Sequence, residues 1–569
     1  MKRPFRGLRR PPDPRYDVVI IGAGVGGLIA ANLLVRSGAK VLLLEQHYMA
    51  GGYCSTFRRA GFTFDAATHF YPLLGNPETL TGRLLAELGI GTGWVKMDPV
   101  DTFHFPDGSR FAVPADFEAY LRKLKAEFPL EAAALDGFFA EVREVYLLGL
   151  LCYFRGRSVP RLEPFRGLTV RQALDRHFRD PKLKLLLTAD CPHWGSPPGR
   201  TSFVFDSMLR LSYFLGNYYP KGGSQAFADE LALRFEERGG HILMSTAARR
   251  ILIEEGAGSN GGPAARGVEI ETLRGPLRQG DSGGNHGKTA ETAEAGAAGG
   301  GLRTIHCDAV VSNADLIATL ERLVGPRHLP PGYLAGLAAL RPTYPCFLTH
   351  IGLTGVESET LEELQGYYWD SWEMDRVGSD ALRFKLFAPT LYEPAMAPPG
   401  RQVLIVQKVL EMDYDQIEDW PRHKQRVEEF IFGHLRRLLP GLEEKIVVRT
   451  SATAQTAWRF TLNYQGAMLG WEMSPDQLGD GRPDLSSPVE NLFLVGHWTR
   501  PGGGITPVIV SAQQVAQAVA SSLGARAAAA ETGSDTATGV PADLLSAGEP
   551  AGVGGLAALL RAVSVDRPN

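Results

Sequence analysis

The stretch YDVVIIGAGVGGLIAANLLVRSGAKVLLLEQ, residues 16–46, decides the fold of this chain. An apolar run over residues 17–21 predicts a buried strand, and residues 28–36 have helical spacing and good helix formers. Gly38 stops that helix, and residues 41–44 form a second apolar run. The order of strand, glycine turn, helix and strand predicts a βαβ unit.

The glycine turn of this unit fits the dinucleotide fingerprint. Gly22 allows a tight turn, Gly24 lets the backbone approach a pyrophosphate, and Gly27 lets helix and strand pack closely, with Gly26 inside the same turn. Glu45 follows the second strand, where an acid accepts hydrogen bonds from a ribose hydroxyl and repels a 2′-phosphate. The pattern therefore predicts a dinucleotide bound at the N-terminus of the helix.

Two further groups of glycines favour FAD over NAD. Gly51 and Gly52 lie just past the acid and allow the chain to wrap closely along an extended cofactor. Residues 495–508, VGHWTRPGGGITPV, place another glycine loop before a helix far along the chain. A second glycine loop and helix N-terminus suit the ribityl chain and flavin ring of FAD.

With these motifs the chain resembles the FAD-dependent family of phytoene desaturases, carotenoid cis–trans isomerases and retinol saturases. The resemblance rests on an N-terminal block with VLLLEQHYMAGG and GFTFDAATHFY, a middle block with YPKGGSQAFADELALRFEERGGHILMSTAARRI and DAVVSNAD, and a C-terminal block with YQGAMLGWEMSP and ENLFLVGHWTRPGGGITPVIVSAQQVA. LEQH, AGG-C and THFY lean toward the saturases and isomerases, whereas PGGGITP leans toward the desaturases.

The resemblance also implies which residues bind FAD. Glu45 would meet the adenosine ribose, the backbone of Ala248 the adenine, and residues 504–507 the flavin ring. Ala248 stands where the family usually has valine. Together with the glycines above, the predicted FAD-binding residues are Gly22, Gly24, Gly26, Gly27, Glu45, Gly51, Gly52, Ala248, Gly496, Gly504, Ile505, Thr506 and Pro507.

Three residues are candidates for catalysis. His69 and Tyr71 follow the glycine pair, and His497 stands where the family often has Gly-Asp or Gly-Ala near the cofactor. Two interpretations of His69 and Tyr71 stay open: they lie beside the substrate at the flavin face, or they are core or cofactor-wall residues. Cys54 is interpreted as a small packed residue. No nucleophile triad is evident, and flavin chemistry requires none, because the cofactor itself takes the hydride.

We predict an α/β fold with a discontinuous Rossmann-type FAD-binding domain of the two-dinucleotide-binding-domain flavoprotein type, and an α+β substrate domain. The FAD-binding domain would combine residues 16–100, 216–330 and 466–523, and the substrate domain residues 101–215 and 331–465. Composition predicts a basic, disordered leader over 1–15, a low-complexity loop over 271–301 and a mostly disordered tail over 524–569.

Composition limits the partners and the compartment. The net charge of −4 over 569 residues argues against nucleic acid. The five scattered cysteines suggest neither a metal site nor a disulfide framework. No apolar run is long enough for a spanning helix. We therefore expect a cytoplasmic protein, with a basic leader that anionic lipid headgroups attract.

The resemblance implies a long apolar polyene substrate, a carotenoid or retinoid, and hence peripheral association with a membrane surface. Desaturation by hydride transfer to flavin is favoured, with a quinone or oxygen as electron acceptor. The alternatives within the family are a redox-neutral isomerase that uses reduced FAD and a retinol-type saturase. Outside it, the alternatives are an amine oxidase and a non-catalytic flavin carrier.

Overall fold

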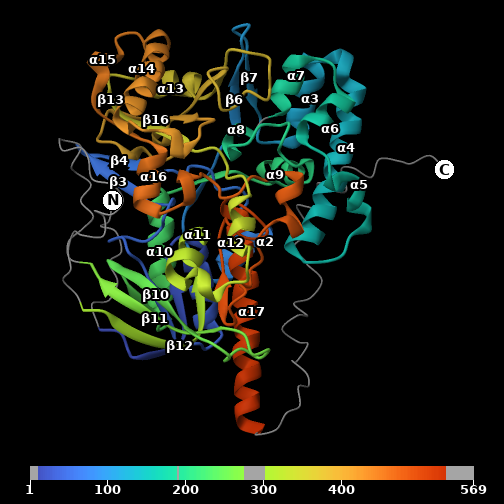
Figure 1. Ribbon diagram of the computed structural model, residues 1–569. Coiled ribbons are helices and arrows are strands. Elements are labelled where there is room, and N and C mark those ends of the chain that lie inside the picture. Colours follow the sequence, from blue (N-terminus) through green and yellow to red (C-terminus); the bar gives the residue numbers. More distant parts are fainter. Residues whose placement is uncertain (1–10, 189–190, 274–300, 533–569) are drawn as a thin grey trace.

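The computed structural model describes residues 11–188, 191–273 and 301–532 (Figure 1). The leader before residue 11, residues 274–300 of the predicted low-complexity loop and the tail from residue 533 lie outside these ranges. The described chain forms two seven-stranded sheets, two sheets of two strands each and a lobe of helices. No helix in the described ranges is both long and apolar enough to cross a bilayer.

The first large sheet is built around the βαβ unit of residues 16–46. β1 pairs in parallel with β2 on one side and with β12 on the other. The parallel strands are, in spatial order, β9 (His241–Leu243), β2 (Val41–Leu44), β1 (Arg15–Ile21), β12 (Arg303–Ser312) and β18 (Leu492–Leu494). The antiparallel strands β10 (Thr246–Glu254) and β11 (Ala264–Thr272) extend the sheet from the first half of β12.

Three helices cover one face of this sheet. They are α1 (Val25–Arg36), α10 (Ser224–Glu237) and α17 (Ile505–Thr532), and their apolar side chains share one core with β1 and β2. α1 begins at Val25, inside the glycine fingerprint, because Gly24 is its extended N-cap and the next residues are already helical. The α/β fold class is thereby confirmed. α17 runs on through Thr532, past residue 524, where the composition places the start of the tail.

The second large sheet joins two segments that are far apart in sequence. Its strands are, in order, β17 (Ile446–Ala452), β13 (Cys346–Thr354), β16 (Arg401–Val409), β15 (Leu382–Phe387), β14 (Gly366–Trp369), β6 (Asp101–His104) and β7 (Arg110–Val113). α13 (Ser358–Leu364), α14 (Trp420–Leu438) and α15 (Leu442–Lys445) cover its outer face. The inner face packs on the hairpin β3 (Thr56–Arg59) and β4 (Phe62–Asp65) and on Phe70.

The helical lobe lies beside β6 and β7 (Figure 1). Its main helices are α3 (Phe117–Glu127), α4 (Ala132–Gly149), α6 (Val170–His177), α7 (Pro181–Leu187) and α9 (Phe203–Phe214). α4 and α9 approach closely at Gly149, where an added Cβ would lie 2.8 Å from the Met208 sulfur. Inside the lobe Arg210 forms a buried ion pair with Asp206, at 2.9 Å.

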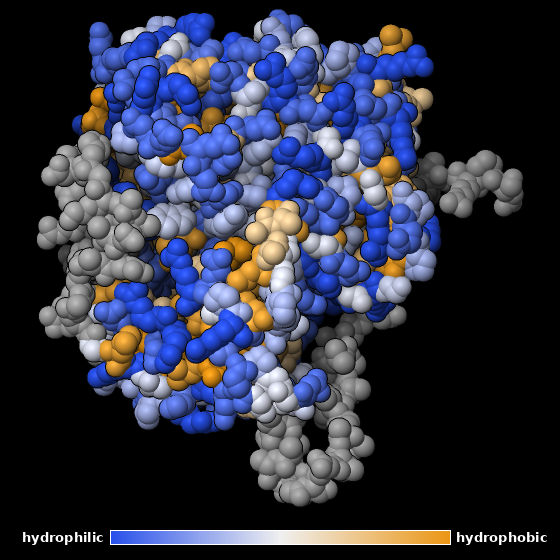
Figure 2. Space-filling model, in the orientation of Figure 1, coloured by the Kyte–Doolittle hydropathy of each residue, from blue (hydrophilic) through white to orange (hydrophobic). Residues whose placement is uncertain are grey.

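The face of the molecule that Figure 2 shows is mostly polar, with apolar side chains gathered in one part of it. Figure 2 shows apolar side chains gathered over the part of the face where α12 (Tyr333–Ala338) and β10–β12 lie. Leu323, Tyr333 and Leu334 are only half-buried there and pack on the core beneath, and Leu302 before β12 is 64% exposed. This apolar face lies on the same sheet that carries the dinucleotide fingerprint.

Candidate functional site

The site begins at the glycine turn between β1 and α1. Gly22 has φ +97°, and its N–H donates to the Leu44 carbonyl at 2.8 Å. An added Cβ on Gly27 would lie 2.1 Å from the Gly22 carbonyl oxygen, so helix and strand touch here. Gly24 is the N-cap of α1 and brings no side chain to cap it. The first N–H groups of α1 are therefore available to an anion at the turn.

Glu45 is held in place at the end of β2. The N–H groups of Ala23 and His47 each donate to one carboxylate oxygen of Glu45, both at 2.8 Å. Burial raises the pKa of Glu45 above its ordinary value, although these backbone N–H groups oppose the rise. A carboxylate has about four acceptor positions, so lone pairs remain for ribose hydroxyls.

The chain after β2 returns to the same turn. The Gly51 N–H donates to the Ala23 carbonyl at 2.8 Å, and Gly24 and Gly51 form a β-bridge. Gly51 and Gly52 have φ +118° and +58°, and an added Cβ on Gly51 would lie 2.5 Å from the Cys54 carbonyl oxygen. Both glycines are thus required by backbone conformation or close approach.

Asn313 is a residue of this site that the sequence analysis missed. It directly follows β12, and its side chain lies over the turn, where added Cβ atoms on Gly24 and Gly26 would meet it at 2.8 and 2.5 Å. An added Cβ on Gly496 would also meet it, at 3.2 Å. The available signal was its place after an apolar run, because the carboxyl ends of neighbouring parallel strands meet at one edge of a sheet.

The C-terminal glycine block completes the same edge. The Gly496 N–H donates to the Ser511 hydroxyl of α17 at 3.2 Å, and Gly504, with φ +101°, directly precedes α17. The Thr506 hydroxyl donates to the Pro72 carbonyl at 2.9 Å, and Pro507 lies in the same first turn of α17. Residues 504–507 therefore lie beside the segment that follows Tyr71, with the helix N-terminus directed at it.

Ala248 lies near the opposite end of the site. It belongs to β10, whose first residue, Thr246, donates its N–H to the Glu45 carbonyl at 2.8 Å. Ala248 pairs with Ile270 of β11 through the backbone and is half-buried. Ala248 thus lies two residues along β10 from the residue that contacts Glu45.

His497 is neutral, and its ring forms a hydrogen bond with the side-chain amide of Asn463. Its Nε2 lies 3.2 Å from the Asn463 side-chain oxygen, which also accepts from Trp498 at 3.2 Å. Burial, together with the nearby charge of Arg482, lowers the pKa of His497 to about 3. Asn463 oxygen can only accept, so His497 Nε2 carries the hydrogen. At neutral pH this histidine is a hydrogen-bond donor and not a cationic acid.

His69 and Tyr71 are both buried, in different cores. His69 stacks on Phe387 at 5.1 Å, and its Nε2 lies 3.3 Å from the Gln407 amide oxygen of β16. Burial lowers the pKa of His69 to about 3. Tyr71 packs on Trp94 and Phe227, and burial raises its pKa well above 10. The structure therefore places His69 against the second sheet and Tyr71 in the core of the first.

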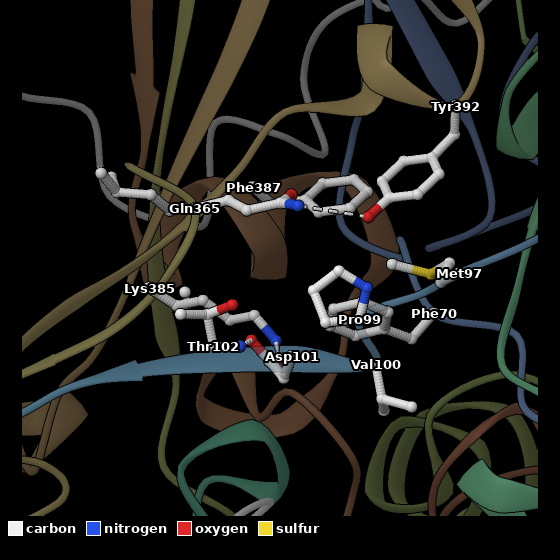
Figure 3. A pocket seen from close by; sticks show the side chains of 12 residues that line it. Phe70, Met97, Pro99, Val100, Asp101, Thr102, Gln365, Lys385, Phe387 and Tyr392 are labelled. Atoms are coloured by element: carbon white, nitrogen blue, oxygen red, sulfur yellow. Dashed lines mark hydrogen bonds and ion pairs between the residues drawn. The ribbon is translucent and has the colours of Figure 1, made fainter. Parts of the chain in front are cut away.

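A small cavity lies beside Phe70 and Phe387 (Figure 3). It has about 10 Å³, room for one water molecule, and Phe70 and Tyr392 line it. Asp101 of β6 and Lys385 of β15 also line it and form a buried ion pair, with side chains 12% and 3% exposed. Lys385 Nζ lies 3.8 Å from the centre of the Phe70 ring. The sequence analysis missed this pair because its members are 284 residues apart.

The residues at the sheet edge fit FAD. The glycine turn is open to a diphosphate, Glu45 keeps free acceptor positions, and a second helix N-terminus lies at the other end. These features define a flavoprotein of the two-dinucleotide-binding type. The chain belongs to the family of flavin-containing amine oxidoreductases, whose family model matches residues 25–520. The predictions of the FAD cofactor and of an FAD-dependent oxidoreductase are confirmed.

Three curated relatives show which branch of the family is similar. The chain is 27% identical over 534 residues to a zeta-carotene-forming phytoene desaturase of Myxococcus xanthus, covering 88% of this chain and 93% of the relative. It is 26% identical to an all-trans-retinol 13,14-reductase of Macaca fascicularis, covering 87% and 84%. It is 25% identical to a chloroplastic prolycopene isomerase of Daucus carota, covering 91% and 82%. The predicted family resemblance is confirmed.

Solved structures support the fold. An oxidoreductase from Methanosarcina mazei matches with a TM-score of 0.60 at 16% identity, covering 88% of this chain and 99% of that one. A putrescine oxidase with bound putrescine matches with a TM-score of 0.58 at 15% identity, covering 90% and 100%. At these identities the likeness concerns the fold alone.

Proposed function

We propose that this FAD-dependent oxidoreductase desaturates a long apolar polyene of the carotenoid or retinoid type. The observation that carries the proposal is the 27% identity to the phytoene desaturase over 88% of this chain. The names of the other two relatives, a retinol reductase and a prolycopene isomerase, also refer to polyenes. The motif RPGGGITP, residues 500–507, resembles the desaturase form and favours desaturation.

Different residues along the edge of the sheet would bind different parts of FAD. The glycine turn and α1 would hold the diphosphate, Glu45 the ribose, Ala248 the adenine, and residues 504–507 the flavin end. FAD when bound supplies the hydride acceptor. His69 and His497 would form part of the wall and not act as charged acids, because burial lowers the pKa of each to about 3.

The neutral wall also agrees with an apolar substrate. Burial lowers the pKa of His350 to about 4 and that of His193 well below its ordinary value. Aromatic rings surround these histidines, with His193 on Phe70 at 5.1 Å and His350 on Phe57 at 4.9 Å. A polyene would not have to desolvate charges at these side chains, which supports this substrate class over a charged one.

The test is turnover of a panel of linear carotenes and retinol by the purified holoenzyme with liposomes. Products are separated by chromatography and detected by mass. One series contains an added quinone or oxygen, and a second is anaerobic with reduced flavin. Desaturation predicts a loss of two hydrogens per step and a red-shifted absorbance, seen only with an acceptor.

Redox-neutral isomerisation and saturation are the second candidates. The motifs LEQH and THFY and the retinol reductase and isomerase relatives favour them. An unchanged mass with altered retention, seen only with reduced flavin, would replace desaturation by isomerisation. A gain of two hydrogens would replace it by saturation. Consumption of amines, with every polyene unchanged, would overturn the substrate class and make the chain an amine oxidase.

A further inference from the structure

Arg482 is a buried cation at the C-terminal end of the candidate site. Arg482 is 2% exposed. Its guanidinium donates hydrogen bonds to backbone carbonyl groups of two segments. The acceptors are the carbonyl oxygens of Thr499 (3.1 Å), Glu472 (3.2 Å), Gln477 (3.4 Å), Trp471 (3.1 Å) and His497 (2.7 Å). Arg482 therefore connects residues 471–477 to residues 497–499, which lead into the glycine loop before α17.

The charge of Arg482 is not neutralised by an acid. Within the ranges that the structure describes, none of its hydrogen bonds or ion pairs goes to a carboxylate. The carboxylate of Glu472, in the same segment, is bound by Arg200 at 2.7 Å and Arg341 at 3.1 Å. Burial lowers the pKa of Arg482 to about 9, which leaves it protonated at neutral pH. An unpaired buried charge is costly, and a neutral residue of similar volume would avoid that cost.

This charge lies directly behind the glycine loop. The guanidinium carbon is 3.8 Å from the position of an added Cβ on Gly502. Two of its acceptors, His497 and Thr499, belong to the same C-terminal block. The N-terminus of α17, which carries the positive end of the helix dipole, begins three residues after Gly502. Both positive elements therefore lie next to the glycine loop at the end of the site assigned to the flavin ring.

We propose that Arg482 raises the reduction potential of the bound flavin by placing a fixed positive charge behind the glycine loop at residues 502–504. This inference rests on the proposed placement of the flavin. Hydride transfer moves two electrons and one proton from a substrate C–H to the flavin, while the second proton leaves the substrate to water or a base. The flavin then carries a negative charge, which a nearby cation in a water-poor site stabilises. Arg482 is in this sense a positioning residue that makes the flavin a stronger hydride acceptor.

The test compares three variants of the holoenzyme with the wild type. Arg482→Met keeps the volume and removes the charge, Arg482→Lys keeps the charge, and Arg341→Met removes a neighbouring, 46% exposed guanidinium as the matched control. The readouts are the flavin reduction potential and the affinity for sulfite, whose lone pair adds to flavin N5 and leaves negative charge on the ring. Arg482→Met should weaken sulfite binding at least about tenfold, which corresponds to about 30 mV for a two-electron couple. Arg341→Met should change neither.

The outcomes separate this inference from the proposed function. If Arg482→Met keeps FAD with the sulfite affinity and potential of the wild type, Arg482 only connects two loops and the inference is wrong. Should that variant not fold, Arg482→Lys decides, because a tenfold loss of sulfite affinity with the charge retained would also overturn the role of charge. The reduced wild type should show the spectrum of the anionic flavin at about pH 6, since the cation lowers the flavin pKa. Retained polyene turnover with a neutral reduced flavin would overturn the Arg482 role alone.

Discussion

Backbone hydrogen bonds of the protein itself fix the carboxylate of Glu45. The N–H groups of Ala23 and His47 fix both carboxylate oxygens, and one of these donors belongs to the glycine turn itself. The proposed ribose acceptor and the glycine turn are therefore parts of one hydrogen-bonded unit. Burial raises the pKa of Glu45, and hydroxyl donors of the ribose would favour its ionised form.

Glu45→Ala should weaken FAD retention. The ribose hydroxyls lose their acceptor and the Ala23 N–H loses its partner, so we expect about 1.5–3 kcal/mol, or roughly a 10- to 100-fold higher Kd. Glu87→Ala, in an exposed ion pair with Arg83 on α2 (Leu80–Glu87), is the control. The FAD-to-protein ratio after gel filtration and a fluorescence titration measure the effect. A full complement of tightly bound FAD in Glu45→Ala would show that the assignment is wrong.

At the scale of elements, close approach and long-range pairing hold the site together. α1 touches the turn that precedes it at Gly27, and β12 pairs along one edge first with β11 and then with β18. Asn313 follows β12 and so lies between the N-terminal and C-terminal glycine loops. Each of these contacts places backbone from one element within a few ångströms of another.

Gly27→Ala should damage both the fold and the cofactor site. The new Cβ would meet the Gly22 carbonyl oxygen at 2.1 Å, and neither the strand nor the helix can shift without opening the turn. We expect a lower thermal midpoint and a loss of bound FAD. Gly433→Ala in α14 is the control, because an added Cβ there meets nothing within 4 Å. That change should stabilise the helix by about 0.5–1 kcal/mol. Equal thermal midpoints in the two variants would contradict the argument.

The Asp101–Lys385 pair should stabilise the junction of β6 with β14 and β15. Asp101→Asn removes the carboxylate from a lysine whose side chain is 3% exposed, which we expect to cost about 3–5 kcal/mol. The double variant Asp101→Leu, Lys385→Met removes both charges and should recover much of that loss. Thermal unfolding of the single and double variants measures the difference. A double variant as unstable as Asp101→Asn would mean that packing, and not charge, matters here.

At the scale of the whole molecule, each large sheet combines segments that are remote in sequence. β1 and β2 come from the first 45 residues, β9–β12 from residues 241–312, and β18 from residues 492–494. β6 and β7 belong to the second sheet, where β6 pairs with residues 366–369. His69 and Phe70 pack on the second sheet, against Phe387.

We predict that the protein associates with a membrane surface. The basic residues of the leader favour anionic lipid headgroups, and the apolar face over α12 and β10–β12 favours contact with the apolar part of a membrane. The protein should float with anionic liposomes at low salt and less at high salt. Deletion of residues 1–10 should remove the salt-sensitive part of the binding and leave any apolar part. A protein that never floats with anionic liposomes would contradict this prediction.

Short-range patterns were sufficient for part of this molecule. The βαβ unit and its dinucleotide site follow from glycines, an acid and apolar runs that lie within about 30 residues of each other. The choice of FAD and the family also drew on the glycine block at residues 495–508. Such patterns can be recognised without the rest of the chain, because turn conformation and helix periodicity are local properties. The start of α1 was placed three residues late, because Gly26 and Gly27 were assigned to the turn and are helical.

Local patterns alone do not determine the partners of Asn313, Arg482, Asp101 and Lys385. Arg482 follows a short turn and would pass for a surface residue, yet it is buried among five carbonyl oxygens. His69 and Tyr71, two residues apart, pack in different cores. Burial and partner choice depend on which remote segments fold against a residue, and the free energy of a buried charge or ring depends on those neighbours. The cofactor class could therefore be predicted from the chain, whereas the electrostatics around the cofactor were decided only when the two sheets and the C-terminal loop came together.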